Sequence, residues 1–244
     1  ISVLAGSAWA IDETKMPAEL ASLAKSWPGE GEPGFALGIL QNGEVTFAGG
    51  FGLANLEHDI AIDADTVFDI ASISKQFAGM AIAMLIQEGK IGLNDDIRTH
   101  LDEVPDLGYT ITVEHLLHHT SGVRDWVGLM MISGLSMEDG LTFEQIMRMV
   151  RYQEAVSFEP GTAGAYSNTG YNLLSRLVEV VSGQSFSDWT EQHIFSPLGM
   201  NDTYFPHENG LVTPGRADSY RKSADGSYRR VANRLTALGS SSLH

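Results

Sequence analysis

Three serine–lysine pairs in this sequence have a spacing that can bring a hydroxyl and an amine together. The pattern Ser-x-x-Lys occurs at Ser22/Lys25, Ser72/Lys75 and Ser219/Lys222. In an α-helix, residues three apart lie on one face, one turn from each other. A lysine whose pKa is lowered by burial can then take the proton of the serine and make it a nucleophile. The spacing therefore indicates acyl-transfer chemistry wherever the lysine is buried.

The sequence around each pair separates the three. Ser72/Lys75 begins an apolar stretch, residues 74–88, whose composition predicts a helix inside the protein. The positive end of that helix would favour a serine alkoxide or an oxyanion. Ser22/Lys25 falls on the polar side of a predicted amphipathic helix, and Ser219/Lys222 lies in a polar stretch that we expect to be solvated. The alternative for Ser72/Lys75 is a helix-capping serine beside a surface lysine.

A second candidate site is the segment Tyr166-Ser-Asn168. It is the only Tyr-x-Asn among the 7 tyrosines, and it follows Pro160-Gly161 in a glycine-rich loop. Residues two apart in an extended segment point the same way, so Tyr166 and Asn168 can line one wall of a cleft. A tyrosine there can pass protons and an asparagine amide can hold a substrate carbonyl. The alternative, a loop whose tyrosine packs on the core, is weaker once Ser72/Lys75 is considered.

The composition is that of a folded, acidic protein. Of 244 residues, 43% are hydrophobic, and 31 acidic against 15 basic side chains give a formal net charge of −16. Such a charge disfavours binding to nucleic acid or to anionic lipid. The sequence has no cysteine, which excludes disulfides, thiolate metal ligands and a cysteine nucleophile within it. No apolar run reaches the roughly 20 residues that a membrane-spanning helix needs.

The patterns along the chain predict one hairpin followed by several helices. Asn42-Gly43 between the apolar runs 35–40 and 45–51 predicts a β-hairpin, which other strands should complete. Residues 16–27 and 171–181 have helical periodicity, and Thr142 with Gln145 forms a capping box. Ser185 should open a further helix that stops before Pro197.

Four motifs together resemble the class C β-lactamase-related serine hydrolases, a group that includes β-lactamases, DD-peptidases, D-aminopeptidases and esterases. They are Phe68-Asp-Ile-Ala-Ser72-Ile-Ser-Lys75, His118-His-Thr-Ser-Gly122, Tyr166-Ser-Asn168-Thr-Gly-Tyr171-Asn and Ser196-Pro-Leu-Gly-Met200. The resemblance runs from about residue 16 to the end of the sequence. It implies an α/β (α+β) fold of the β-lactamase/transpeptidase type, with an antiparallel sheet flanked by helices and a mostly helical region.

The resemblance also implies roles for individual residues. Ser72 would be the acylated nucleophile, Lys75 its proton partner, Tyr166 the general acid and base, and Asn168 a residue that positions the substrate. The backbone N–H of Ser72 would form half of an oxyanion hole. The expected function is hydrolysis of ester, D-amino peptide, amide or β-lactam substrates through an acyl-serine, without a cofactor or metal. The alternative is a homologue that binds penicillin or senses peptidoglycan without turnover.

One feature of the family is missing from the sequence. We find no Lys or His followed by Thr/Ser and Gly in a credible strand near the C-terminus, and Leu238-Gly-Ser-Ser-Ser-Leu243 resembles the segment that precedes the last strands of family members. We therefore predict that the C-terminal strands are absent, and that residues 1–244 alone are poorly stable and do not turn over an ester. The predicted regions are 11–76 with the hairpin and nucleophile, a mainly helical 77–210, and a truncated return at 211–244.

Three further features give weaker predictions. Ala8 and Ala10 follow an apolar stretch in the small-x-small pattern of a cleaved signal peptide, so residues 1–10 are interpreted as its remnant and the protein as periplasmic or secreted. His115, His118 and His119 have a helical metal-ligand spacing without the Glu of the metalloprotease motif, and no metal is expected. The predicted partner is a small-molecule or peptide-like substrate, with no nucleic acid and no integral membrane segment; the sequence gives no oligomeric state.

Overall fold

The computed structural model describes residues 16, 20–22, 29–207, 212–231 and 237–244. By its internal contacts the chain divides into two compact units, Ile1–Phe68 with Val212–Ala232, and Asp69–Leu211 with Asn233–His244. The predicted signal-peptide remnant, residues 1–10, lies outside the described residues. The export inferred from it therefore stays a prediction. The predicted division at residues 76 and 210 stays a prediction, and Ser72 and Lys75 lie in the second unit with the helices.

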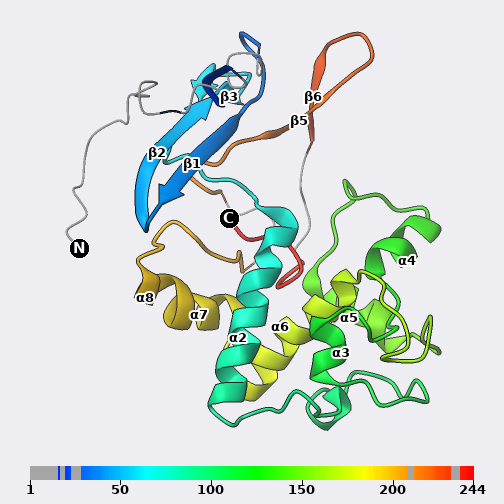
Figure 1. Cartoon of the computed structure of the whole chain (residues 1–244). Coiled ribbons are helices and arrows are strands. Elements are labelled where there is room, and N and C mark those ends of the chain that lie inside the picture. The colour runs from blue at the N-terminus through cyan, green and yellow to red at the C-terminus, as the bar shows by residue number, and fades with distance from the viewer. Residues whose placement is uncertain (1–15, 17–19, 23–28, 208–211, 232–236) are drawn as a thin grey trace. The chain divides into compact units, whose positions relative to one another are not determined.

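The first unit contains the predicted hairpin (Figure 1). Strand β1 (Phe35–Gln41) pairs antiparallel with β2 (Glu44–Phe51), from Phe35 opposite Phe51 to Gln41 opposite Glu44. The connecting residues Asn42 and Gly43 both have positive φ, 52° and 83°, which suits the twist of a two-residue hairpin turn. The Asn-Gly prediction is therefore confirmed.

A small aromatic core lies on one face of this hairpin. Phe35 stacks on Phe51 with ring centroids 5.1 Å apart, and Phe47 is buried against Met16. The backbone after β2 also passes very close to the sheet: a Cβ on Gly50 would lie 2.2 Å from the carbonyl oxygen of Ile62. A glycine is therefore required at this position, because any side chain would collide with that backbone.

Two further strand pairs complete the description of the first unit. Strand β3 (Leu53–Asn55) pairs with β4 (Ile60–Ala61), and β5 (Ser219–Lys222) pairs with β6 (Tyr228–Val231). All three sheets of the described residues are antiparallel and two-stranded. The β5–β6 hairpin was expected only as a solvated stretch. Its signal in the sequence is Asp225-Gly226, where Gly226 has a φ of 86°.

The second unit packs its helices around one hydrophobic core. A 3₁₀ turn, η2 (Ala71–Ser74), leads into α2 (Lys75–Gln87), which packs on α6 (Asn168–Ser182). Helices α3 (Val113–Leu117) and α5 (Phe143–Arg151) also contact α6, and so does α4 (Trp126–Ile132). A short turn η3 (Ile97–Thr99) lies between α2 and α3. Figure 1 shows α6 in the middle of this group.

Helix α2 differs from the wholly buried helix that its composition predicted. Ala78, Ala81, Ile82 and Leu85 are buried in the core, whereas Met80 is 42% exposed. The helix packs one stripe against α6 and leaves the opposite stripe at the surface. An apolar sequence thus did not specify which of its faces would be covered.

The capping signals in the sequence mark the helix ends correctly. Thr142 and Gln145 form the reciprocal capping box of α5, and Gly183 ends α6 in the left-handed conformation. Ser185 caps α7 (Phe186–Thr190) as predicted. The predicted stop before Pro197 is wrong by one turn: a π-helical turn, η4 (Glu191–Phe195), continues into α8 (Ser196–Leu198), where the proline lies in the first turn and needs no hydrogen-bond donor.

Candidate active site

Ser72 and Lys75 lie where the 3₁₀ turn η2 passes into helix α2. Lys75 is the first residue of α2, and its ammonium nitrogen Nζ lies 3.3 Å from Ser72 Oγ. The serine is exposed, whereas Lys75 is only 8% exposed. The helical spacing therefore presents a hydroxyl to solvent with an amine buried directly behind it.

Tyr166 approaches the same hydroxyl from the loop before α6. Its phenol donates a hydrogen bond of 2.8 Å to Ser72 Oγ, and its ring centroid lies 4.8 Å from Lys75 Nζ. The Tyr166 side chain remains 56% exposed. Two proton-carrying groups from distant parts of the sequence thus converge on one oxygen atom.

The buried amine of Lys75 has three acceptors around it. Besides Ser72, Nζ donates to the side-chain oxygen of Asn168 at 2.9 Å and to the carbonyl oxygen of Ser240 at 2.6 Å. Burial lowers the pKa of Lys75 below its ordinary value, against opposing contributions from the contact with Tyr166 and from the charge of Asp125. This brings the neutral amine, the form that accepts a proton, closer to working pH.

Asn168 begins helix α6 and is held by Asp125, a residue that the sequence reasoning missed. Asp125 Oδ1 accepts hydrogen bonds from the backbone N–H groups of Asn168 at 2.6 Å and Thr169 at 3.3 Å. Its other oxygen accepts from the Asn168 amide at 3.4 Å. The carboxylate therefore caps the start of α6 and fixes the amide that faces Lys75. No motif marks Asp125, because its partners lie more than 40 residues away.

His119 packs against the ring of Tyr166. The two ring centroids are 4.7 Å apart, and His119 Nδ1 accepts a hydrogen bond of 3.1 Å from the backbone N–H of Ser167. Burial and the nearby charge of Lys75 both lower the pKa of His119, which favours the neutral ring that can accept this bond. The sequence supplied His119 as part of a motif, but only the structure shows its contact with Tyr166.

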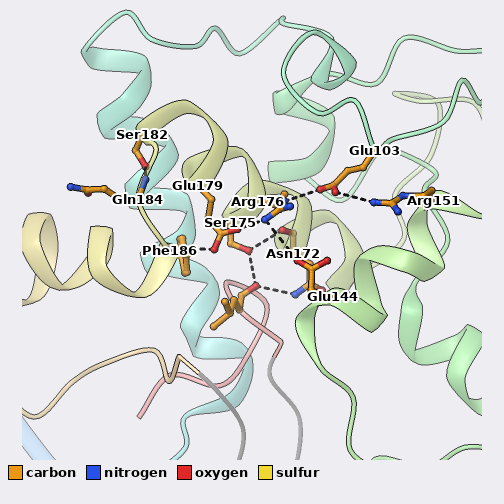
Figure 2. Close-up of polar contacts among 11 residues, drawn as sticks. Glu103, Glu144, Arg151, Asn172, Ser175, Arg176, Glu179, Ser182, Gln184 and Phe186 are labelled. Atoms are coloured by element: carbon orange, nitrogen blue, oxygen red, sulfur yellow. Dashed lines mark hydrogen bonds and ion pairs between the residues drawn. The ribbon is translucent and has the colours of Figure 1, made fainter.

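The third acceptor of Lys75 comes from the segment 237–244. The Asn172 amide and the Ser175 hydroxyl of α6 each donate to the carbonyl oxygen of Leu238 at 2.9 Å (Figure 2). At the other end of the segment, the backbone N–H of Leu243 donates to Ser74 Oγ at 3.2 Å. These anchors set the Ser240 carbonyl against Lys75, a contact that the sequence did not predict.

Helix α6 itself is held by a charged cluster on its outer side. Arg176 pairs with Glu103 at 2.9 Å and with Glu179 at 2.9 Å, and Arg151 of α5 reaches Glu103 at 3.5 Å (Figure 2). Glu179 also accepts a hydrogen bond from the backbone N–H of Phe186, at the start of α7. The helix that carries Asn168 is therefore tied to three neighbouring segments.

The pair Ser219/Lys222 does not form such a site. Ser219 and Lys222 lie on strand β5, and the lysine forms an ion pair of 2.6 Å with Glu32 at the surface. Ser22 is exposed, and Lys25 lies outside the described residues. Of the four predicted site residues, Ser72, Lys75, Tyr166 and Asn168, all come together at one point of the second unit.

The histidines of the 115–119 segment have structural partners. His115 completes a capping box with Thr112 at the start of α3, and His119 has the contacts described above. Among the described residues there is no group of three or more His, Asp or Glu side chains placed to hold a metal. In the same part of the chain, no helix is long and apolar enough to cross a bilayer.

The sequence is similar to a family model and to several known proteins. The family model described as Beta-lactamase matches residues 20–239. Penicillin-binding protein 4* of Bacillus subtilis (strain 168) is 32% identical over 180 residues, 74% of this chain and 39% of that protein. A D-aminopeptidase of Gluconobacter oxydans (strain 621H) is 28% identical over 230 residues, 94% of this chain and 42% of that protein.

A solved structure is similar over nearly the whole chain. The octameric penicillin-binding protein homologue from Pyrococcus abyssi superposes with a TM-score of 0.77 at 29% identity, over 92% of this chain and 51% of that one. The chain thus spans less than half the length of the two curated relatives. The fold is of the β-lactamase/transpeptidase type, and the chain belongs to the beta-lactamase family.

Proposed function

We propose that this chain is a serine hydrolase whose Ser72 is acylated by ester, D-amino peptide or amide, or β-lactam substrates. The observation that carries the proposal is the convergence of Tyr166 and Lys75 on Ser72 Oγ, at 2.8 and 3.3 Å. A hydroxyl in contact with two groups that can exchange protons, one of them a buried lysine, is the arrangement that nucleophilic catalysis needs.

The first step is formation of an acyl-serine. Lys75 as a neutral amine, or Tyr166 as a phenolate, takes the proton of Ser72, and Oγ bonds to the carbonyl carbon of the substrate. The bond between that carbon and the leaving nitrogen or oxygen then breaks, and the same pair of residues returns the proton to the leaving group. In this proposal the side-chain N–H of Asn168, whose amide is held by Asp125, donates to a carbonyl group of the substrate.

The second step is hydrolysis of the acyl-serine by water. Tyr166 is 56% exposed and contacts Ser72 Oγ, so in its phenolate form it can deprotonate a water molecule that approaches the ester carbon from the solvent side. The water oxygen bonds to that carbon, the bond from the carbon to Ser72 Oγ breaks, and Tyr166 returns the proton to Oγ. The backbone N–H of Ser72 supplies one donor to the oxyanion in both steps.

The names of the relatives support the D-amino peptide and β-lactam part of this range. One relative is a D-aminopeptidase, and others are penicillin-binding proteins. A penicillin-binding homologue that is acylated but releases the acyl group slowly is the second candidate. The two candidates share Ser72 as nucleophile and differ only in the rate of the second step.

The test separates acylation from turnover. The 244-residue chain is incubated with nitrocefin, p-nitrophenyl acetate or D-alanine p-nitroanilide, and the adduct is located by intact-mass measurement and peptide mapping. We expect an adduct on Ser72 with at least one of these compounds, absent in Ser72→Ala and retained in the matched control Ser219→Ala. An adduct without product release supports the penicillin-binding candidate. No adduct on Ser72 from any of the three compounds overturns the proposal.

A further inference from the structure

Apart from the group around Ser72, the helical unit has a pocket between α4 and α5. Its volume is about 590 Å³, which is within the range of pockets that hold small organic ligands. It is lined by residues from the start of α4, the loop after it and the length of α5: Arg124, Leu129, Leu135, Leu141, Gln145, Arg148, Met149, Tyr152, Gln153 and Glu154. It shares no residue with the group around Ser72.

One part of the wall is apolar and continues to the surface. Leu129 and Leu135 contribute from α4 and its following loop, and Leu141 and Met149 close the other side. Ile132 and Met131 of α4 are 87% and 66% exposed and do not line the pocket. The apolar wall itself favours a ligand that buries a hydrocarbon body.

The charged side chains that line the pocket have a net positive charge. Arg124 and Arg148 line it, and neither guanidinium forms a hydrogen bond or ion pair with another described residue. Glu154 is the only acidic side chain among the lining residues. Two guanidinium groups against one carboxylate leave a single positive charge, in a chain whose formal net charge is −16. This balance suits a monoanion better than a cation or a multiply charged anion.

The wall that carries Arg124 is held in place by its backbone. Gln153, which is 7% exposed, accepts from the N–H of Arg124 and donates to its carbonyl oxygen, both at 3.0 Å. The Thr169 hydroxyl donates to the same carbonyl oxygen, also at 3.0 Å. A fixed wall means that a ligand loses little binding free energy in ordering the pocket.

We propose that this pocket binds an amphipathic monocarboxylate, a small molecule with one carboxylate and an apolar body. Its carboxylate pairs with Arg124 and Arg148, and its hydrocarbon chain lies against Leu129, Leu135, Leu141 and Met149. Binding here does not depend on the chemistry at Ser72, so it stands or falls separately from the proposed hydrolase activity.

Calorimetry with octanoate below its micelle concentration tests the proposal, with octanamide as the neutral probe of the same shape. The experiment uses the Ser72→Ala chain, so that acylation cannot contribute. We expect octanoate to bind at one site per chain. Octanamide should bind more than about fivefold more weakly, because it loses both partly exposed charge pairs and each is worth up to about fivefold.

Paired variants localise the binding. Arg148→Gln should weaken octanoate about fivefold and leave octanamide unchanged, whereas Arg151→Gln, one turn away outside the pocket, should change neither. Leu135→Asp should weaken both compounds, whereas Ile132→Asp, which is exposed and does not line the pocket, should weaken neither.

Several results would overturn the proposal. They are no saturable binding of octanoate, equal affinity for octanoate and octanamide, an affinity for octanoate that Arg148→Gln leaves unchanged, and equal effects of the pocket variants and their matched controls. The last result would mean general adsorption to the exposed apolar residues near α4.

Discussion

The two serine–lysine pairs for which the structure describes both residues share a spacing and differ in everything else. Ser72 and Lys75 belong to the helical unit, where the lysine is 8% exposed and touches the serine. Ser219 and Lys222 belong to the strand unit, where residues three apart on β5 point to opposite faces and the lysine pairs with Glu32. The same four-residue pattern therefore makes a candidate site or a surface ion pair, according to backbone period and burial.

The two units also differ in how polar groups are held. Around Lys75 the acceptors are a side-chain amide and a backbone carbonyl, brought together by packing of α2, α6 and the segment 237–244. Around Lys222 the partners are Glu32 and the ring of Tyr228, both reached from the surface. Loss of a partner should be costly in the first setting and minor in the second, because water can replace only the exposed contacts.

The largest expected difference is between Lys75→Met and Lys222→Met. Both changes remove an ammonium group and keep most of the apolar side chain. Lys75→Met should slow acylation of Ser72 about a thousandfold, because the buried proton acceptor is lost. Lys222→Met should leave the rate unchanged. The measurement is the rate of adduct formation by mass spectrometry, and equal rates in the two variants would remove Lys75 from the proposed mechanism.

Gly239→Ala should be the next largest effect. Gly239 has a φ of 76°, and a Cβ there would lie 2.8 Å from the carbonyl oxygen of Tyr171 and 2.9 Å from Ser175 Cβ. The left-handed strain and the collision should together cost about 3 kcal/mol of the free energy of unfolding. The displaced segment should also lose its contact with Lys75 and slow acylation. Gly226→Ala, at a β-turn with open space around it, is the control for left-handed strain alone.

The pH dependence of acylation should follow the protonation state of Lys75. Since burial lowers the pKa of Lys75, the rate should rise with pH through a midpoint below that of a free lysine. Between the folded and unfolded pKa values the unfolded chain binds more protons, so the free energy of unfolding should also rise with pH in that window. Rate profiles and denaturant unfolding of the native chain and Lys75→Met test this. A midpoint that is the same in both proteins would assign the titration to another group.

Asp125→Asn should have an intermediate effect confined to the helical unit. It removes the charge that caps α6 and holds Asn168, at an expected cost of about 1 kcal/mol and about tenfold in acylation rate. Chemical unfolding and adduct formation measure the two effects. Asp188→Asn, at the start of α7 and away from Ser72, is a matched control that should leave the acylation rate unchanged.

The smallest effect is expected at Glu32 in the strand unit. Hydrogen bonds from Lys222, Tyr228 and the N–H of Gly29 lower the pKa of Glu32 to about 2 from 4.5. Its contribution to stability is therefore present above pH 4.5 and is lost as the pH falls toward 2. Glu32→Gln should lower the melting temperature slightly at neutral pH, flatten its decline in acid, and leave acylation unchanged. An acylation rate that fell in this variant would contradict the separation of the two units.

Much of the local structure could be predicted because it depends on neighbouring residues. Asn42-Gly43 specifies its own turn, Thr142 and Gln145 cap their own helix, and Gly183 ends α6. The predicted helix stop before Pro197 was wrong, because a proline can either end a helix or lie in its first turn. Only the backbone before the proline decides which of the two occurs. The β5–β6 hairpin was missed because its strands are charged and alternate weakly, although Asp225-Gly226 was a usable signal.

The candidate site likewise has a part that the sequence predicted and a part that it did not. The types and spacing of Ser72, Lys75, Tyr166 and Asn168, together with the family resemblance, predicted that these four side chains form one site, and the structure brings them together. The contacts of Asp125, His119 and the carbonyl of Ser240 could not be predicted, since they span distances of 43 to 165 residues along the chain. The sequence therefore determined which groups are available for the proposed acyl transfer. Only the tertiary structure decided which lysine is buried, which carbonyl it meets and which carboxylate steadies its partner, because burial and distance are set by packing and not by order along the chain.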